Sequence, residues 1–278
     1  MNTISLPYDL INDELHDVCF YNYSSKGTKL NHSVNFGYHV INFLIEGTKG
    51  IVSPEKKDII GHNHIILIRS GNCLMTETAS SNGNYLSYLL FFNDLAISNF
   101  KNRFNLSSTS KTRATPTSFL TIQKDEFIAN FITSLRFLSE SKAIWQVKFE
   151  EFMLYLIEQQ GIHLLDFFNP STQNTTINTV IENNLMNDIS LQELAFLCNM
   201  SLSSFKRRFY ETYNDTPFNW IQNRRLDLVK QQLQIDNIRP SDIYLEYGFS
   251  NQSSFTQAFK KRFGITPKQY QNTSKLNF

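Results

Sequence analysis

The chain has 278 residues, which is enough for two domains of ordinary size or one large one. Hydrophobic residues make up 41% of it and aromatic residues 14%, so the composition excludes an intrinsically disordered chain. The formal net charge of +1 does not by itself indicate a nucleic-acid or membrane partner.

The cysteines and the N-terminus indicate the compartment. Cys19, Cys73 and Cys198 are far apart and form no Cys-x-x-Cys pair, so a disulfide framework or zinc site is not expected. The first residues lack the pattern of a signal peptide, and no apolar run approaches the roughly 20 residues of a membrane span. We therefore expect a soluble cytoplasmic protein with no membrane partner and no cofactor.

The first part of the chain, to about residue 105, is predicted to be a small all-β sandwich or barrel. Short apolar runs rich in branched and aromatic residues recur there, and Gly, Asn, Ser or Pro bounds each of them. The clearest runs are 40–45, 50–52, 65–68 and 85–92.

Helical periodicity follows the strands. Residues 105–118 are rich in Ser, Thr and Asn and predict a loop, whereas residues 122–168 carry an apolar stripe at helical spacing. The stripe suits either a helix pair packed on the β-rich part or a helix that pairs between two protomers. The candidates for a homodimer contact within this segment are Trp145, Phe149, Phe152 and Leu156.

Residues 169–176 contain no apolar residue and are predicted to be a linker. The charge changes sign near this point. Residues 1–169 carry 14 Lys and Arg against 16 Asp and Glu, and residues 170–278 carry 12 against 9. The excess of positive charge favours a polyanionic partner for the C-terminal domain, residues 177–278.

The C-terminal domain contains a weak internal repeat of a helix-turn-helix unit. In the first copy, a capping box of Ser190 and Glu193 begins a short helix, and a turn at 199–201 leads to a second helix. In the second copy, Pro240 precedes the first helix and a turn at 248–250 follows it.

The second helix of each copy has the form of a recognition helix. Phe205 with Phe209, and Phe255 with Phe259, lie at i and i+4 and so face the core together. Small polar residues begin each helix and can approach base edges, and basic residues end it and can reach phosphates. The run 220–233 is predicted to be one helix that holds the units apart, so that both enter successive major grooves of double-stranded DNA about 34 Å apart.

These residues resemble the DNA-binding domain of the AraC/XylS family of transcription regulators. The residues that carry the resemblance are 224–226, 242–243, 248–250, 254–267 and Tyr270. Its fixed spacing over about 100 of the 278 residues makes it far more specific than a generic helix-turn-helix. It implies a sequence-specific regulator, an activator, that works with RNA polymerase and is not an enzyme.

In the family, bases are contacted from the early outward positions of each recognition helix. The base-reading residues that this implies are Ser203, Lys206, Arg207, Gln252, Ser253 and Gln257. The phosphate-contacting candidates beside them are Arg208, Ser204, Ser254, Lys260 and Lys261. The chain departs from the family pattern at Tyr244, which suggests different packing under the second unit, and at Gln271, which removes one phosphate contact.

The N-terminal domain, residues 1–168, resembles the cupin-like sensor barrel of the same family at 43–47 and 65–71. The segment 147–152 is similar to activators of type III secretion and virulence genes within it. The resemblance implies an α+β chain with a cupin-like β-barrel at about 1–105, a helical dimerisation segment at 122–168 and an all-α C-terminal domain. A small ligand or a partner protein would control it through the N-terminal domain.

Two other functions stay open. His32, His39, His62 and His64 suggest a cupin metalloenzyme with a DNA-binding tail, but the turn after 65–68 offers no further His ligand, and we expect no metal and no catalytic residue. The chain could also be an interaction adaptor. Metal content after purification would test the metalloenzyme alternative, since that chemistry needs a bound metal. Salt-dependent DNA binding by the C-terminal domain would argue against the adaptor alternative.

Overall fold

The computed structural model describes residues 3–11, 14–106, 117–138, 141–168, 176–235 and 238–275. The chain divides into two compact units, of which the first is 1–176 with 196–199 and the second is 177–195 with 200–278. Almost all of the predicted linker at 169–176, and most of the predicted loop at 105–118, lie outside the described residues.

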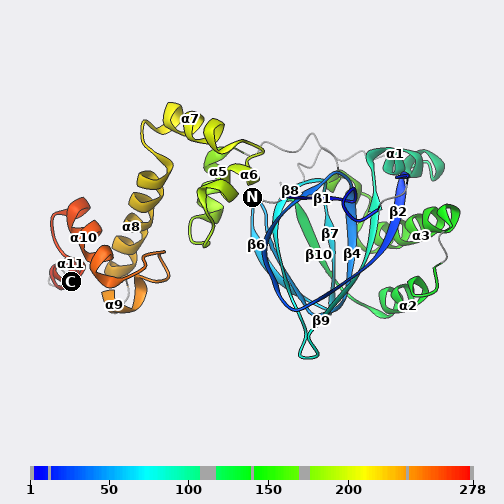
Figure 1. Cartoon of the computed structure of the whole chain (residues 1–278), viewed down its shortest axis with the longest axis horizontal. Coiled ribbons are helices and arrows are strands. Elements are labelled where there is room, and N and C mark those ends of the chain that lie inside the picture. The colour runs from blue at the N-terminus through cyan, green and yellow to red at the C-terminus, as the bar shows by residue number, and fades with distance from the viewer. Residues whose placement is uncertain are drawn as a thin grey trace. The chain divides into compact units, whose positions relative to one another are not determined.

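The described part of the first unit contains ten strands in two sheets of five (Figure 1). The strands are β1 (Thr3–Leu6), β2 (Val18–Lys26), β3 (Lys29–Phe36), β4 (His39–Glu46), β5 (Thr48–Val52), β6 (Lys57–Gly61), β7 (His64–Ile68), β8 (Gly71–Thr78), β9 (Asn84–Phe92) and β10 (Phe119–Gln123). The first sheet has the order β1-β3-β8-β5-β6 and the second the order β10-β7-β4-β9-β2. The β1–β3 pair is parallel, and the other pairs are antiparallel.

The β-rich N-terminal region is confirmed, but the closed barrel is not. Among the described residues, the edge strands β1, β6, β10 and β2 each pair on one side alone. One apolar cluster takes residues from both sheets, such as Val34 and Met75 from the first and Val40 and Phe91 from the second. The strands therefore form a sandwich of two sheets around a shared core.

Four helices cover the outer face of the second sheet (Figure 1). They are α1 (Asp94–Arg103), α2 (Glu126–Leu135), α3 (Lys142–Gln160) and α4 (Leu164–Phe167). Side chains alternate along β4, so Ile41 and Phe43 face the helices while Val40 faces the first sheet. Because β4, β7 and β9 of this sheet are buried on both faces, they are nearly continuous apolar runs, which explains why the sequence shows them so clearly.

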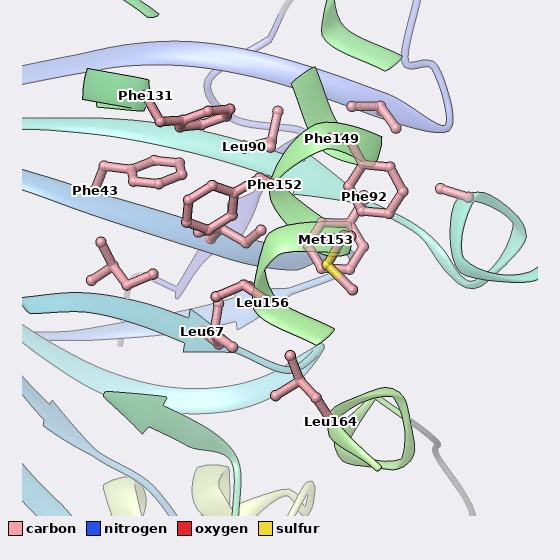
Figure 2. Packing of buried hydrophobic residues seen from close by; sticks show 14 of the residues in the cluster. Phe43, Leu67, Leu90, Phe92, Phe131, Phe149, Phe152, Met153, Leu156 and Leu164 are labelled. Carbon is pink, nitrogen blue, oxygen red and sulfur yellow. The ribbon is translucent and has the colours of Figure 1, made fainter. Parts of the chain in front are cut away.

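The stripe on α3 lies in this helix-to-sheet core. Phe149, Phe152 and Leu156 are fully buried, and the ring of Phe152 lies 5.0 Å from that of Phe43 (Figure 2). Trp145 is partly buried against the same core. Three of the four dimer candidates are therefore interior residues of one protomer and are not a surface available to a second one. The apolar stripe in the sequence predicted a buried helix face but did not identify the surface that buries it.

The second unit is helical throughout its described part (Figure 1). Its helices are α5 (Ile177–Asn184), α6 (Leu191–Leu197), α7 (Leu202–Tyr213), α8 (Pro217–Ile235), α9 (Pro240–Ile243), α10 (Gln252–Phe263) and α11 (Pro267–Lys275). The predicted connecting helix is α8, and the predicted capping box forms, since Glu193 accepts from Ser190 N at 2.6 Å. The first helix of the second repeat is shorter than expected and ends at Ile243. None of the described helices is both long and apolar enough to span a bilayer.

Candidate nucleic-acid interface

The first recognition helix is α7. Ser201 caps it by accepting from the backbone N–H of Ser204 at 3.2 Å. Phe205 and Phe209 are fully buried, and the Phe209 ring packs 5.9 Å from that of Trp220 at the start of α8. The buried pair fixes the rotation of the helix about its own axis, so the opposite face is presented to solvent. The predicted reading residues Ser203, Lys206 and Arg207 are all exposed.

The second recognition helix, α10, is built in the same way. Asn251 caps it by accepting from Ser254 N at 2.8 Å, and Gly264 ends it with a φ of 80°, the left-handed conformation that favours glycine. Phe255 and Phe259 are buried in a cluster with residues of α8. The predicted reading residues Gln252, Ser253 and Gln257 are all exposed.

The predicted phosphate contacts divide into two groups. Arg208, Lys260 and Lys261 are exposed and free to reach a polyanion. The two serines are already engaged in the helix caps, where Ser204 Oγ lies 2.9 Å from Ser201 Oγ and Ser254 Oγ donates to Asn251 O at 2.9 Å. The serines therefore belong to the helix caps, whereas the three basic side chains face solvent.

One member of the second basic cluster has a different role. Arg262 donates from Nη2 to both oxygens of Asp227 on α8, at 2.7 and 2.9 Å, and from Nε at 3.1 Å. Such a bidentate pair holds the guanidinium in a fixed plane. It ties the end of α10 to α8 and takes Arg262 out of the set of free cations. The two residues are 35 positions apart, so no local pattern in the sequence could have revealed this pair.

The connecting helix sets the separation of the two readers. It has 19 residues and is therefore about 28 Å long. The first recognition helix, α7, packs on the first turn of α8, at Trp220. The second, α10, packs on the later part of α8, where Lys230 Nζ lies 5.0 Å from the Phe263 ring centroid. One rigid element of nearly the length of a DNA helical repeat thus carries both recognition helices (Figure 1).

The two departures from the family pattern have structural roles. Gln271 is buried and donates to the backbone carbonyl of Ile238 at 2.7 Å, so it holds the C-terminal helix instead of facing outward. Tyr244 packs at the edge of the apolar cluster that contains Phe255 and Phe259. Neither residue belongs to the exposed face of α7 or α10.

The first unit contains a pocket of about 380 Å³. Its walls are mostly apolar and include Val34, Phe36 and Leu89. Polar side chains line the pocket from three neighbouring strands. Glu77 on β8 lies directly across from Lys29 on β3 and from Lys49 on β5. This size and composition are typical of a small-molecule site.

The polar side of this pocket is incompletely paired. Within the described residues, the Asn42 side-chain amide and Nε2 of His32 are buried without a hydrogen-bond partner. Burial disfavours the ammonium form of Lys49, but Tyr85 and Glu77 outweigh that effect and raise the pKa of Lys49. Lys49 Nζ makes a weak contact with Met75 Sδ at 3.9 Å and lies 5.7 Å from the centroid of the Tyr85 ring. Unpaired buried donors and acceptors carry a cost that a bound polar group would remove.

Two of the histidines considered for a metal site contact neighbouring polar side chains. His39 is buried, with Nε2 2.9 Å from Asp94 Oδ1 and Nδ1 accepting from Ser70 N at 3.0 Å. His62 is exposed, and Nδ1 of His64 contacts Asn63 at 2.8 Å. In the part of the chain that the structure describes, no three His, Cys, Asp or Glu side chains are grouped to hold a metal ion.

Comparison with known proteins defines the family. Residues 39–167 match the family model of the ExsA N-terminal regulatory domain, and residues 194–273 match that of a helix-turn-helix domain. The virulence regulon transcriptional activator VirF of Yersinia enterocolitica is 30% identical over 182 residues, which are 62% of this chain and 67% of VirF. The chain belongs to the AraC family of transcription regulators. The AraC-type resemblance of the C-terminal half, and the likeness of the N-terminal half to virulence and type III secretion activators, are thereby confirmed.

Other proteins similar to this AraC-family chain cover it to different extents. The transcriptional regulator ExsA of Pseudomonas aeruginosa is 32% identical over 126 residues, 44% of this chain and 45% of ExsA. Among solved structures, fatty-acid-bound ToxT of Vibrio cholerae is 13% identical with a TM-score of 0.41, covering 94% of this chain and 97% of ToxT.

Proposed function

We propose that this AraC-family chain is a transcription activator that binds two successive major grooves of double-stranded DNA through α7 and α10 and acts on RNA polymerase. The observation that carries the proposal is the repeated arrangement of the two helices. Each has a buried Phe pair on one side and exposed polar or basic side chains on the other, and both are attached to α8. The activator VirF among its relatives supports activation as the outcome.

The two recognition helices have different chemistry. The exposed face of α7 carries Lys206, Arg207 and Arg208, and we assign to it most of the affinity. The exposed face of α10 begins with Gln252 and contains Gln257, and glutamine pairs naturally with adenine. We assign base choice mainly to α10.

In vitro selection of DNA with the full chain, followed by titration of the selected site, tests this assignment. Lys206→Ala and Gln257→Ala should each weaken binding by about 1–3 kcal/mol, and Gln257→Ala should relax the preference at one base position. The matched control is Lys57→Ala, which removes an exposed lysine from the first unit and should leave binding unchanged. Wild-type affinity in both reading-face variants would contradict the assignment.

We further propose that the pocket of the first unit holds a small amphiphilic effector. Its polar group would pair with Asn42, His32 and the Lys49 ammonium, and its apolar body would lie against walls such as Phe36 and Leu89. Calorimetric titration with octanoate and with 1-octanol tests this, because the two probes share a chain and differ in charge. Octanoate should bind more tightly, and Lys49→Met should abolish the difference. Equal binding of both probes by the wild type would refute an anionic effector.

A homodimer through residues 122–168 remains part of the proposal, on a different face of α3. The side chains of Ile144, Val147 and Leu154 are exposed on that helix, in contrast to the buried stripe. Sedimentation of Val147→Glu tests the contact, since a charge in an apolar seam should dissociate a dimer while leaving the fold of each protomer unchanged. A variant that sediments like the wild-type dimer would rule out this face.

A further inference from the structure

We propose that Arg225 is a positioning residue that fixes the angle between the two recognition helices and thereby sets the spacing of the DNA elements that the chain accepts. Arg225 lies on α8, away from the exposed faces of α7 and α10, and half-buried. The inference rests on the proposed DNA binding and adds to it a determinant of site spacing.

Arg225 is anchored on the turn that leads into the first helix-turn-helix. Its Nε donates to the backbone carbonyl of Leu185 at 2.8 Å, and its Nη2 donates to that of Asn187 at 3.4 Å. Both carbonyls lie in the turn between α5 and α6. Burial lowers the pKa of Arg225, and Asp188 opposes that effect. A partly desolvated guanidinium needs these acceptors, so its position is tied to this turn.

The other face of the same guanidinium abuts the second helix-turn-helix. A Cβ placed on Gly248 would lie 2.2 Å from Nη1 of Arg225 and 2.9 Å from its Cζ, so the backbone of the turn is in direct contact with the side chain. Gly248 has a φ of 75°, and the next residue, Phe249, packs 5.2 Å from Phe255 at the start of α10. A shift of the guanidinium would therefore be transmitted to the recognition helix.

Two ion pairs of α8 close to Arg225 each reach one half of the unit only. Arg224 pairs with Glu182 of α5 at 2.9 Å, and Asp227 pairs with Arg262 of α10. Beside Arg225 there is a pocket of about 270 Å³ whose walls come from both halves, including Leu194, Phe218 and Phe249. The pocket therefore interrupts the apolar packing at this point, where the guanidinium of Arg225 contacts both halves.

The experiment measures spacing discrimination by the full chain. A DNA site selected with the wild type is compared with versions that have one base pair added or removed between the two elements, which rotates one element by about 35° and shifts it by about 3.4 Å. The wild type should bind the altered sites at least tenfold more weakly. Arg225→Ala should bind the selected site more weakly and discriminate by threefold or less. Arg224→Ala, the neighbouring arginine on the same helix, should keep the wild-type ratio.

A second pair of variants tests the contact itself. Gly248→Ala should lower discrimination more when Arg225 is present than in the Arg225→Ala background. The positive φ strains alanine in both backgrounds, but the added Cβ collides with the guanidinium only in the first. If Arg225→Ala does not fold, Arg225→Lys replaces it in the experiment, because lysine keeps the charge but lacks the planar fork of donors. Arg225→Lys should also discriminate by threefold or less. Tenfold discrimination in the folded Arg225 variant would overturn the inference. A wild-type chain that selects no DNA would instead overturn the proposed function.

Discussion

The salt dependence of DNA binding follows from the number of free cations on the two recognition helices. Five of them are exposed, and they are Lys206, Arg207, Arg208, Lys260 and Lys261. Arg207 also lies 3.9 Å from Glu211, but both side chains are exposed and such a pair is weak. If each cation neutralises one phosphate, the logarithm of the binding constant should fall against the logarithm of salt with a slope of about −4.5.

The perturbation is the removal of one free cation, Lys260→Ala. The slope should change to about −3.6, so that raising the salt from about 50 to about 200 mM costs about 150-fold in affinity instead of about 500-fold. Fluorescence anisotropy on a selected site, repeated at four salt concentrations, measures both slopes.

Arg262→Ala is the matched comparison, because Arg262 lies on the same helix but is held by Asp227. Its slope should stay close to that of the wild type. An equal reduction in slope for both variants would refute the division into free and paired cations. A wild-type slope shallower than about −2 would refute the count itself.

Three further predictions concern the fold that supports the site. Phe152→Ala should lower the free energy of unfolding by about 3–5 kcal/mol in urea titrations, since the ring is fully buried, whereas Gln159→Ala at an exposed position of the same helix should change it by less than about 1 kcal/mol. Asn251→Ala should remove the cap of α10 and cost about 1 kcal/mol, measured in the same way. Burial lowers the pKa of His39 below its usual 6.5, so the unfolded chain binds the proton more tightly than the folded chain. The stability should therefore fall as the pH falls through 6.5. In thermal melts at several pH values, His39→Gln should flatten this dependence.

The parts of the fold that the sequence predicted are those specified by local patterns. The Ser190–Glu193 capping box, the early position of Pro240 and the paired phenylalanines each have a fixed short spacing, and each occurs as expected. Three strands of the second sheet, β4, β7 and β9, were visible because both of their faces are buried. In contrast, the edge strand β2 of that sheet carries alternating exposed polar residues toward its end, and β3 is rich in polar residues. Their patterns were too weak to separate from loops.

Contacts between distant residues were beyond the sequence. The stripe that includes Phe149 and Phe152 required a buried face but left open whether a sheet or a second protomer buries it. One member of the basic cluster at 260–262, Arg262, forms an ion pair with Asp227, and the sequence pattern did not indicate it. The position of Arg225 against Gly248 depends on a turn 23 residues away, and no local spacing encodes it.

The central claim is that two recognition helices on one rigid body enter successive major grooves. Protection of guanine N7 from methylation, measured with the full chain on a selected DNA site, reports major-groove contact directly. Two protected clusters are expected on one face of the duplex, with centres about 10 base pairs apart. A single protected cluster would contradict this arrangement. Two clusters whose spacing differs from about 10 base pairs by about half a helical turn would also contradict it.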